Sequence, residues 1–186
     1  MKLESRLGDM LRKWRGTTRG SPPRVSNAEV FWSWLGAFLG IGAVALVGHL
    51  TMPEGPAVML IGSFGASAVL LYGAPRSPLA QPRNLIGGHV LSALVGVACW
   101  KLQMPLVGLG EALAVATAIA LMHLTRTLHP PGGATALIAL VGGDRVHALG
   151  FGFALLPVGA GALAMLAIAV LVNNLPRSRR YPEIWF

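Results

Sequence analysis

The chain has 186 residues, of which 54% are hydrophobic and only 12% are charged, and its mean hydropathy is +0.62. Soluble domains carry about 25% charged residues, so this composition excludes an ordinary soluble domain and favours a membrane protein. The net charge is +8, and ten of the fifteen basic residues lie before residue 25 or after residue 176. Basic ends of this kind attract anionic lipid and stay in the cytoplasm, so we expect a lipid bilayer as partner and no nucleic acid.

The first 28 residues are mostly polar, but apolar side chains recur in them at helical spacing: Leu3, Leu7, Met10, Leu11 and Trp14. This spacing predicts a short amphipathic helix in the lipid headgroup layer, with a disordered basic tail as the alternative. The apolar run that follows, residues 30–50, is long enough to cross a bilayer, which takes about 20 residues. Because a cleaved signal peptide has a short apolar core near the start of the chain, we expect this run to remain as a membrane helix.

Six apolar segments alternate with breakers along the chain: residues 30–50, 57–73, 85–100, 111–128, 132–142 and 148–172. The first loop has no lysine or arginine and the second has two arginines, so the positive-inside rule places the second loop and both basic ends in the cytoplasm. We therefore expect a multi-pass protein of the cell inner membrane with both termini cytoplasmic. A count of four crossings would place the ends equally well. The expected parts are a cytoplasmic basic segment (1–28), a transmembrane domain (29–175) and a cytoplasmic basic tail (176–186).

A short internal repeat favours six segments over four. Residues 65–69 read GASAV and residues 133–137 read GATAL, five matching positions at an offset of 68. The two copies fall in the second and fifth segments, the middle members of two three-helix halves. Halves with an odd number of helices must have opposite orientations, which is the inverted-repeat plan of many transporters. The predicted fold is therefore an all-α membrane bundle of two inverted three-helix repeats, with broken or short second and fifth helices.

Helix breakers precede both copies of the repeat. Pro130, Pro131, Gly132 and Gly133 precede a segment of about 11 residues, which rises only about 16 Å as a helix. It is too short for a hydrocarbon core of about 30 Å, so it should begin at membrane depth, where irregular backbone must line protein or a water-filled cavity. Helices that begin at Gly133 and near Gly65 would face each other and bind a small anion with their unpaired N–H groups.

Two hydroxyl side chains occupy matching positions after these glycines. Ser67 and Thr135 would add donors to such an anion site, or they would serve close helix packing, as small residues commonly do in membranes. Within the breaker region, His123 and Arg126 share a helix face. Arg126 either anchors the helix end at the cytoplasmic surface or attracts the anion. His129 either caps a carbonyl or, with a free pKa near 6.5, binds an anion or relays a proton.

A second polar cluster precedes the third segment. Arg83 and Asn84 immediately precede that segment, either in a plain cytoplasmic loop or in one that dips inward to concentrate anions at the inner mouth. His89 is an isolated imidazole that makes an interhelical bond or belongs to the site. The acidic residues form no carboxylate metal cage and no acid/base pair, and the single Cys99 cannot form an internal disulfide. We therefore expect no enzyme, no cofactor and no metal.

Three strings carry a resemblance to a known family: FGASAVLLYGAPRSPLAQPRNLIGGH, LMHLTRTLHPPGGATALIAL, and the Asn pair at 173–174. Over residues 30–175 the chain resembles the HPP family of integral membrane proteins. The resemblance implies a polytopic membrane protein, usually described with four membrane helices, and nitrite transport for plant and cyanobacterial relatives. The matching motif residues are Ser77, Pro78, Gln81, Pro82, Arg83, Asn84, His89, Thr127, His129, Pro130, Pro131, Gly132 and Gly133.

These observations predict a membrane transporter or channel for a small monovalent anion, nitrite. The ion would arrive by way of Arg83 or Arg126 and rest between the helix starts at Gly65 and Gly133. A non-transporting structural or regulatory membrane protein that recruits a cytoplasmic partner is the alternative, and membrane enzymology on lipid or quinone is the least favoured class. Gly- and Ala-rich helix faces also favour a homo-oligomer.

Overall fold

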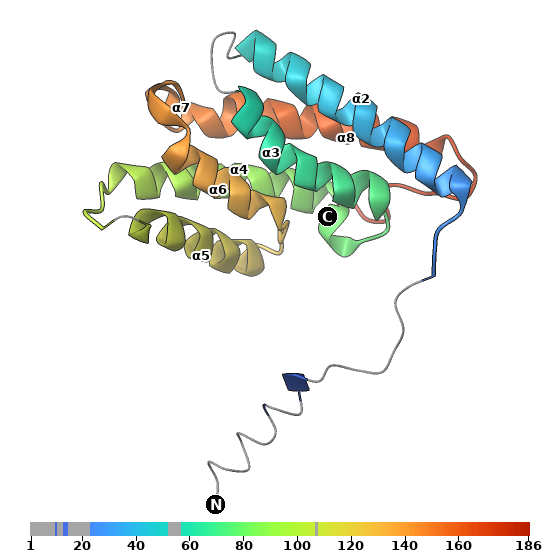
Figure 1. The fold of residues 1–186 in the computed structure, drawn as a ribbon, viewed down its shortest axis with the longest axis horizontal. Helices are drawn as coiled ribbons and strands as arrows, with labels where there is room; N and C mark the ends of the chain where they lie inside the picture. The colour runs from blue at the N-terminus through green and yellow to red at the C-terminus, as the bar shows by residue number, and fades with distance from the viewer. Residues whose placement is uncertain (1–9, 11–12, 15–22, 52–56, 107) are drawn as a thin grey trace, which may run out of the picture.

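The structure is a computed structural model that describes residues 10, 13–14, 23–51, 57–106 and 108–186. The predicted N-terminal amphipathic helix lies for the most part outside these residues. The described part is all-helical and has no strand, which confirms the all-α prediction. Its helices are α2 (Asn27–Thr51), α3 (Ala57–Ala68), α4 (Pro82–Lys101), α5 (Leu109–Leu124), α6 (Pro131–Val141), α7 (Gly143–Leu149) and α8 (Ala160–Asn174). In Figure 1, α2 and α8 form one side of the bundle and α5 the other, with α3, α4 and α6 between them.

Each predicted apolar segment contains a helix, and two of them begin or end in π-helical turns. The second segment is α3 followed by a π-helical turn, Val69–Gly73, and the last is α8 preceded by another, Ala154–Gly159. Among the described residues, Asn27–Thr51 and Ala154–Asn174 are the two helices long and apolar enough to cross a membrane alone. The fifth segment is short as expected, because α6 has 11 residues. The six crossings and the inverted repeat stay predictions.

One element of the repeat prediction is wrong. α3 begins at Ala57, eight residues before Gly65, so no helix starts near that glycine. An isolated glycine weakens a helix by only about 1 kcal/mol relative to alanine, and the stretch from Ala57 to Ala68 contains no proline. The helix therefore runs through Gly65 and reaches Ser67 in its last turn.

The Tyr72 ring packs against small residues on α2. The buried positions of α2 recur every four residues, at Gly36, Gly40, Val44 and Gly48. A Cβ added at Gly40 would lie 2.2 Å from the Tyr72 hydroxyl oxygen, and one at Gly36 would lie 2.4 Å from the same ring. Only this narrow stripe is covered by protein, and the other faces of α2 expose large apolar side chains such as Phe38 and Leu46. Such an apolar outer surface is typical of a helix in lipid.

Helices α4 and α6 pack closely against each other. A Cβ added at Gly96 would lie 2.4 Å from the Ala136 carbonyl oxygen, and one at Gly132 would lie 2.7 Å from the Ser92 hydroxyl. Glycine at both positions allows the backbones to approach, as small residues do in membrane bundles. α4 also contacts α5 and α8, so its polar residues lie in the centre of the bundle.

Candidate functional site

The two motif loops meet at the start of α4. After α3, a 3₁₀ turn at Pro78–Ala80 leads into α4, which has Pro82 at its first position. The Leu79 carbonyl oxygen accepts a hydrogen bond of 2.8 Å from His129 Nδ1, and Asn84 Nδ2 donates to the Leu128 carbonyl oxygen at 2.8 Å. The SPLAQPRN string and the HPPGG string, some 50 residues apart in sequence, therefore form one structural unit, which we call the paired loops (residues 74–84 and 125–133).

Behind the paired loops, four buried side chains form a continuous hydrogen-bonded chain. Thr135 Oγ1 lies 2.7 Å from His89 Nδ1, and Ser67 Oγ lies 2.8 Å from His89 Nε2 and 2.8 Å from His129 Nε2. All four side chains are fully buried. They come from α3, α4, α6 and the loop before α6. The two residues of the internal repeat, Ser67 and Thr135, thus flank the same imidazole.

The hydrogen positions in this hydrogen-bonded chain follow from its end at the Leu79 carbonyl oxygen. His129 Nδ1 faces a carbonyl oxygen, which only accepts, so Nδ1 carries the hydrogen. With a neutral ring, His129 Nε2 accepts from the Ser67 hydroxyl, whose oxygen in turn accepts from His89 Nε2–H. His89 Nδ1 then accepts from the Thr135 hydroxyl. Every hydrogen bond points in one direction, from Thr135 to the Leu79 carbonyl, and the two histidines hold opposite tautomers.

Apolar and aromatic packing surrounds this chain. The Phe64 ring stacks on His89 with centroids 4.4 Å apart, and the two histidine rings lie 5.0 Å apart. In the described part of the chain every buried side-chain nitrogen and oxygen has a hydrogen-bond partner. The described residues also contain no group of three metal-binding side chains, so the two histidines are not joined by a third ligand. The centre of the described bundle is therefore polar, and its buried side-chain donors and acceptors are paired.

The predicted anion site between two helix starts does not form. At the start of α6, Pro130 and Pro131 have no N–H group, Gly132 N donates to the His129 carbonyl at 2.8 Å, and Gly133 N donates to the Pro130 carbonyl at 3.1 Å. The first N–H groups are therefore absent or used within the turn. Gly65 lies inside α3, as described above. A Cβ added at Gly65 would meet no atom within 4 Å, and one at Gly133 would meet only Val115 at 3.7 Å.

The cationic residues of the prediction lie together at the surface. Arg83, Asn84 and Arg126 line one pocket of about 230 Å³, together with Gln81 and the C-terminal residues 184–186. Arg83 Nη2 also donates to the Thr125 carbonyl oxygen at 2.7 Å. His123 is exposed and lines neither this pocket nor the buried chain. We call this pocket the arginine pocket.

Arg126 occupies an unusual backbone position for its residue type. Its φ is +57°, in the left-handed region. The Arg126 N–H bonds the His123 carbonyl at 3.2 Å, and the Thr127 N–H bonds the Met122 carbonyl at 2.9 Å. These two bonds are the Schellman motif that ends α5, in which glycine is usual at this position. An arginine there accepts a backbone penalty of roughly 1 to 2 kcal/mol, and the residue is one of those that line the arginine pocket.

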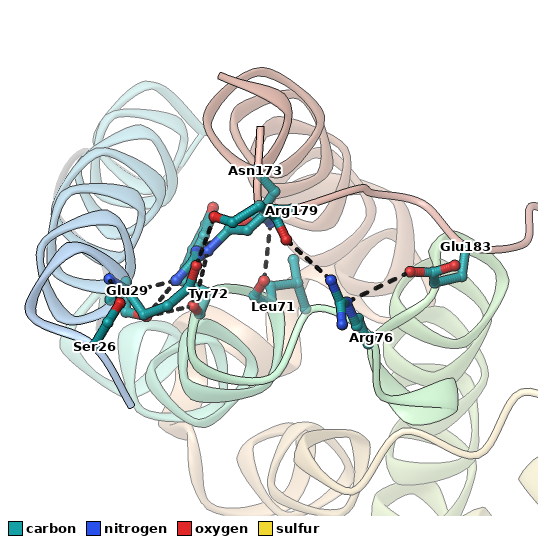
Figure 2. A network of polar contacts seen from close by, with 10 residues as sticks. Ser26, Glu29, Leu71, Tyr72, Arg76, Asn173, Arg179 and Glu183 are labelled. Carbon is teal, nitrogen blue, oxygen red and sulfur yellow. Dashed lines mark hydrogen bonds and ion pairs between the residues drawn. The ribbon is translucent and has the colours of Figure 1, made fainter. Parts of the chain in front are cut away.

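A further polar network was not predicted. Arg179, expected in a basic tail, is only 8% exposed. It lies between α2, the π-helical turn after α3 and the end of α8, as Figure 2 shows. Its guanidinium donates to Glu29 Oε2 at 2.8 Å, to Asn173 Oδ1 at 3.0 Å and to the Tyr72 carbonyl at 3.2 Å. Asn173 Nδ2 donates to the Leu71 carbonyl at 3.0 Å. The network pairs carbonyl oxygens at the end of the π-helical turn.

The C-terminal segment covers the paired loops as a result. Tyr181 is buried, and its hydroxyl donates to the Ala80 carbonyl oxygen at 2.8 Å. The Gln81 side chain donates to the Ser77 carbonyl at 2.8 Å and accepts from the Glu183 N–H at 2.9 Å. The buried side chains of Arg179 and Tyr181 therefore fix the C-terminal segment to the bundle. In the sequence, the Asn pair at 173–174 indicates that further polar residues pack nearby, because two amides at the end of a membrane helix need hydrogen-bond partners.

The apolar outer surface, the small-residue helix contacts and the buried polar centre together define an all-helical membrane protein. The family described as HPP, transmembrane region, matches residues 22–182, and the chain belongs to this family. This confirms the family resemblance stated from the motifs.

Two curated relatives come from Dictyostelium discoideum, and each is described only as a transmembrane protein. One is 45% identical over 181 residues, which are 94% of this chain and 57% of the relative. The other is 45% identical over 182 residues, which are 94% of this chain and 62% of the relative. The chain thus spans about three fifths of the length of these relatives. No solved structure matches the chain.

Proposed function

We propose that this membrane protein transports a small monovalent anion, and that nitrite is the ion. The observation that carries the proposal is the arginine pocket, where Arg83 and Arg126 come together from two different motif loops beside Asn84. Two cations beside low-dielectric walls concentrate anions from solution. A pocket of about 230 Å³ has room for such an ion and several waters, since a water occupies about 30 Å³ in the liquid.

The chemistry of the pocket fits an ion with two equivalent oxygens. A guanidinium presents a planar fork of N–H donors that matches a carboxylate in two parallel hydrogen bonds. Nitrite is bent and carries its charge on two oxygens, so it matches this fork as a carboxylate does. The family resemblance independently implies nitrite for plant and cyanobacterial relatives.

The anion would pass from the arginine pocket toward the buried chain by separation of the paired loops. Asn84 lines the pocket and also bonds the Leu128 carbonyl, one residue before His129. The contact of the Leu79 carbonyl with His129 Nδ1 closes the same interface. The route between the arginine pocket and the buried hydrogen-bonded side chains is therefore closed in the described arrangement. Transport requires α6 and its loop to move relative to α4.

The charge distribution supports the proposed orientation. The paired loops, the start of α2 and the end of α8 lie at one end of the bundle, joined by the hydrogen bonds of Arg83, Arg76 and Arg179. This arginine-rich end would face the cytoplasm under the positive-inside rule. Both termini would then be cytoplasmic in an inner membrane. Homo-oligomerisation stays a prediction from the small-residue helix faces.

Nitrite uptake into liposomes that contain the purified protein tests the proposal. We expect uptake above that of protein-free liposomes, reduced about tenfold or more in Arg83→Ala and Arg126→Ala, in line with the tenfold or larger effects of electrostatic concentration. Lys101→Ala is the matched control, because it removes an exposed cation from the far end of α4, and it should retain uptake. Absence of uptake under any gradient would favour a non-transporting protein that recruits a cytoplasmic partner.

A further inference from the structure

The Ser67 hydroxyl lies between two imidazoles and is the hydrogen-bond partner of the Nε2 atom of each. Its oxygen lies 2.8 Å from His89 Nε2 and 2.8 Å from His129 Nε2. A serine hydroxyl has one hydrogen, so it donates to one ring and accepts from the other. The direction of the whole chain therefore depends on where that hydrogen lies, and reversing it changes the tautomer of His89.

A second arrangement of the same atoms holds one more proton. In it, His129 is protonated on both nitrogens and donates to Ser67, Ser67 donates to His89 Nε2, and His89 Nδ1–H donates to Thr135. The Thr135 hydroxyl then turns to the Pro131 carbonyl, 3.4 Å away.

The two arrangements interconvert by proton hops and by rotation of the Thr135 hydroxyl toward the Pro131 carbonyl. One proton arrives at His89 Nδ1, the Nε2 proton of His89 moves to Ser67, and the Ser67 proton moves to His129 Nε2. The reverse sequence releases one proton.

We propose that Ser67 relays protons between His89 and His129, and that this relay couples the transport of the anion to the transport of one proton. The inference rests on the proposed anion transport and adds its driving force. Ser67 and Thr135 act as positioning and proton-carrying residues in this scheme, and the arginine pocket supplies the anion.

The surroundings of the relay explain why proton and anion would move together. From α3, His89 is faced by Phe64 and Ser67, from α6 by Thr135, and from the loop before α6 by His129. Among the described residues, the titratable group facing each ring is the other histidine. The buried hydroxyl of Tyr72 donates to the Met165 carbonyl and takes no part.

No carboxylate among the described contacts neutralises a protonated His129. A positive charge without a partner is strongly unfavourable at a fully buried position such as this one. A monovalent anion that arrives next to the ring neutralises it, so each makes binding of the other more favourable. Release of the anion likewise favours release of the proton, and the net charge carried across the membrane is zero.

Nitrite uptake under two separate driving forces tests the relay. Liposomes containing the protein are given either an inward proton gradient or a potassium diffusion potential set with valinomycin. Protein-free liposomes under the same gradients correct for nitrous acid that crosses the lipid. For the native protein we expect uptake driven by the proton gradient and unchanged by the potential.

Two matched pairs of variants locate the relay. Ser67→Ala removes the central hydroxyl and should reduce proton-driven uptake at least tenfold, whereas Ser67→Thr retains a hydroxyl and should keep the dependence on the proton gradient. Thr135→Val and Thr135→Ser form a second pair with the same expectation, available if Ser67→Ala does not fold. Nitrogen NMR of the two rings in nanodiscs should show Nε2–H for His89 and Nδ1–H for His129.

The outcomes separate this inference from the proposal beneath it. Uptake that follows the potential and ignores the proton gradient overturns the relay but retains anion transport. Undiminished proton-driven uptake in both Ser67→Ala and Thr135→Val, or equal tautomers for the two rings, also overturns the relay. Absence of uptake under either gradient overturns anion transport and the relay with it.

Discussion

Gly88 gives a quantitative test of how the HPP loop is held. A Cβ added at this position of α4 would lie 2.5 Å from the His129 Cβ and 2.9 Å from the Thr127 carbonyl oxygen. One of these atoms belongs to the backbone of the HPP loop, so the Gly88→Ala variant can form only if the loop moves. We expect this movement to lower stability and also to displace His129 from Ser67.

The magnitude follows from comparison with a glycine that has free space. Gly65→Ala, on α3, meets no atom within 4 Å. Both substitutions replace a helical glycine and gain the same helix propensity, about 1 kcal/mol, which cancels when the two variants are compared. The remaining difference is the overpacking term, about 1 to 3 kcal/mol. We expect Gly65→Ala to be slightly more stable than the native protein and Gly88→Ala to be less stable than Gly65→Ala by that amount.

Thermal unfolding in detergent, followed by tryptophan fluorescence, measures the difference. For a chain of this length 1 kcal/mol corresponds to about 2 to 4 °C in Tm, so Gly88→Ala should unfold about 2 to 12 °C below Gly65→Ala. Nitrite uptake should fall in Gly88→Ala and be retained in Gly65→Ala. Equal Tm values and equal uptake for the two variants would refute the close packing of the HPP loop on α4.

Three further predictions separate charge, packing and protonation. Arg126→Gly should raise Tm because glycine adopts the left-handed backbone without the penalty of about 1 kcal/mol, whereas Arg126→Ala should not raise it. Both variants lose the cation and should reduce nitrite uptake. Arg126→Lys keeps a cation and should retain uptake. Arg179→Met removes a buried guanidinium from the partly exposed Glu29 carboxylate and takes one donor from the buried Asn173 and Tyr72 oxygens. It should destabilise the fold by about 1 to 3 kcal/mol, the cost of a buried polar group left unpaired, whereas Arg180→Met, at an exposed neighbour, should have little effect on Tm. Burial raises the pKa of the Tyr181 hydroxyl above its ordinary value of 10.0. The folded state therefore holds this proton more tightly than the unfolded state, and its contribution to stability is complete below pH 10 and lost as pH rises above it. Proteolysis of the C-terminal segment should accelerate above that pH in the native protein. Tyr181→Phe should remove this alkaline transition. If the transition persists in the variant, a group other than Tyr181 causes it.

The helices could be predicted from the sequence because their signals are local. Apolar runs and the prolines between them mark the helices, and the shortness of α6 follows from the distance between Pro131 and the glycines after Val141. The same local reasoning failed at Gly65. A lone glycine and a Pro-Pro-Gly-Gly string both count as breakers by residue type, but only the prolines remove N–H donors and clash with the preceding turn.

The contacts within the site could not be read from the sequence because they join distant segments. The repeat drew attention to Ser67 and Thr135, yet their common partner, His89, lies outside both copies. Arg179 is a stronger case, since it pairs with Glu29 across 150 positions. A basic residue near a chain end has the same local pattern whether water or a buried carboxylate is its partner, and only the fold decides between them.

Under the proposed transport of an anion, the separation of the permanent cations from the buried hydrogen-bonded side chains would be a condition for turnover. A guanidinium in the centre of the bundle would be very costly without a partner. With an anion as its partner, it would bind that anion too strongly for release. Conduction requires binding weak enough for the ion to leave the site. The structure instead has Arg83 and Arg126 at the surface pocket, and the four described side chains of the buried hydrogen-bonded chain are hydroxyl and imidazole groups. Histidine, whose charge can appear and disappear, would then provide a cation only while the anion is present. This mechanism would need the two motifs together, because each loop contributes one arginine to the pocket and one histidine follows each arginine into the core.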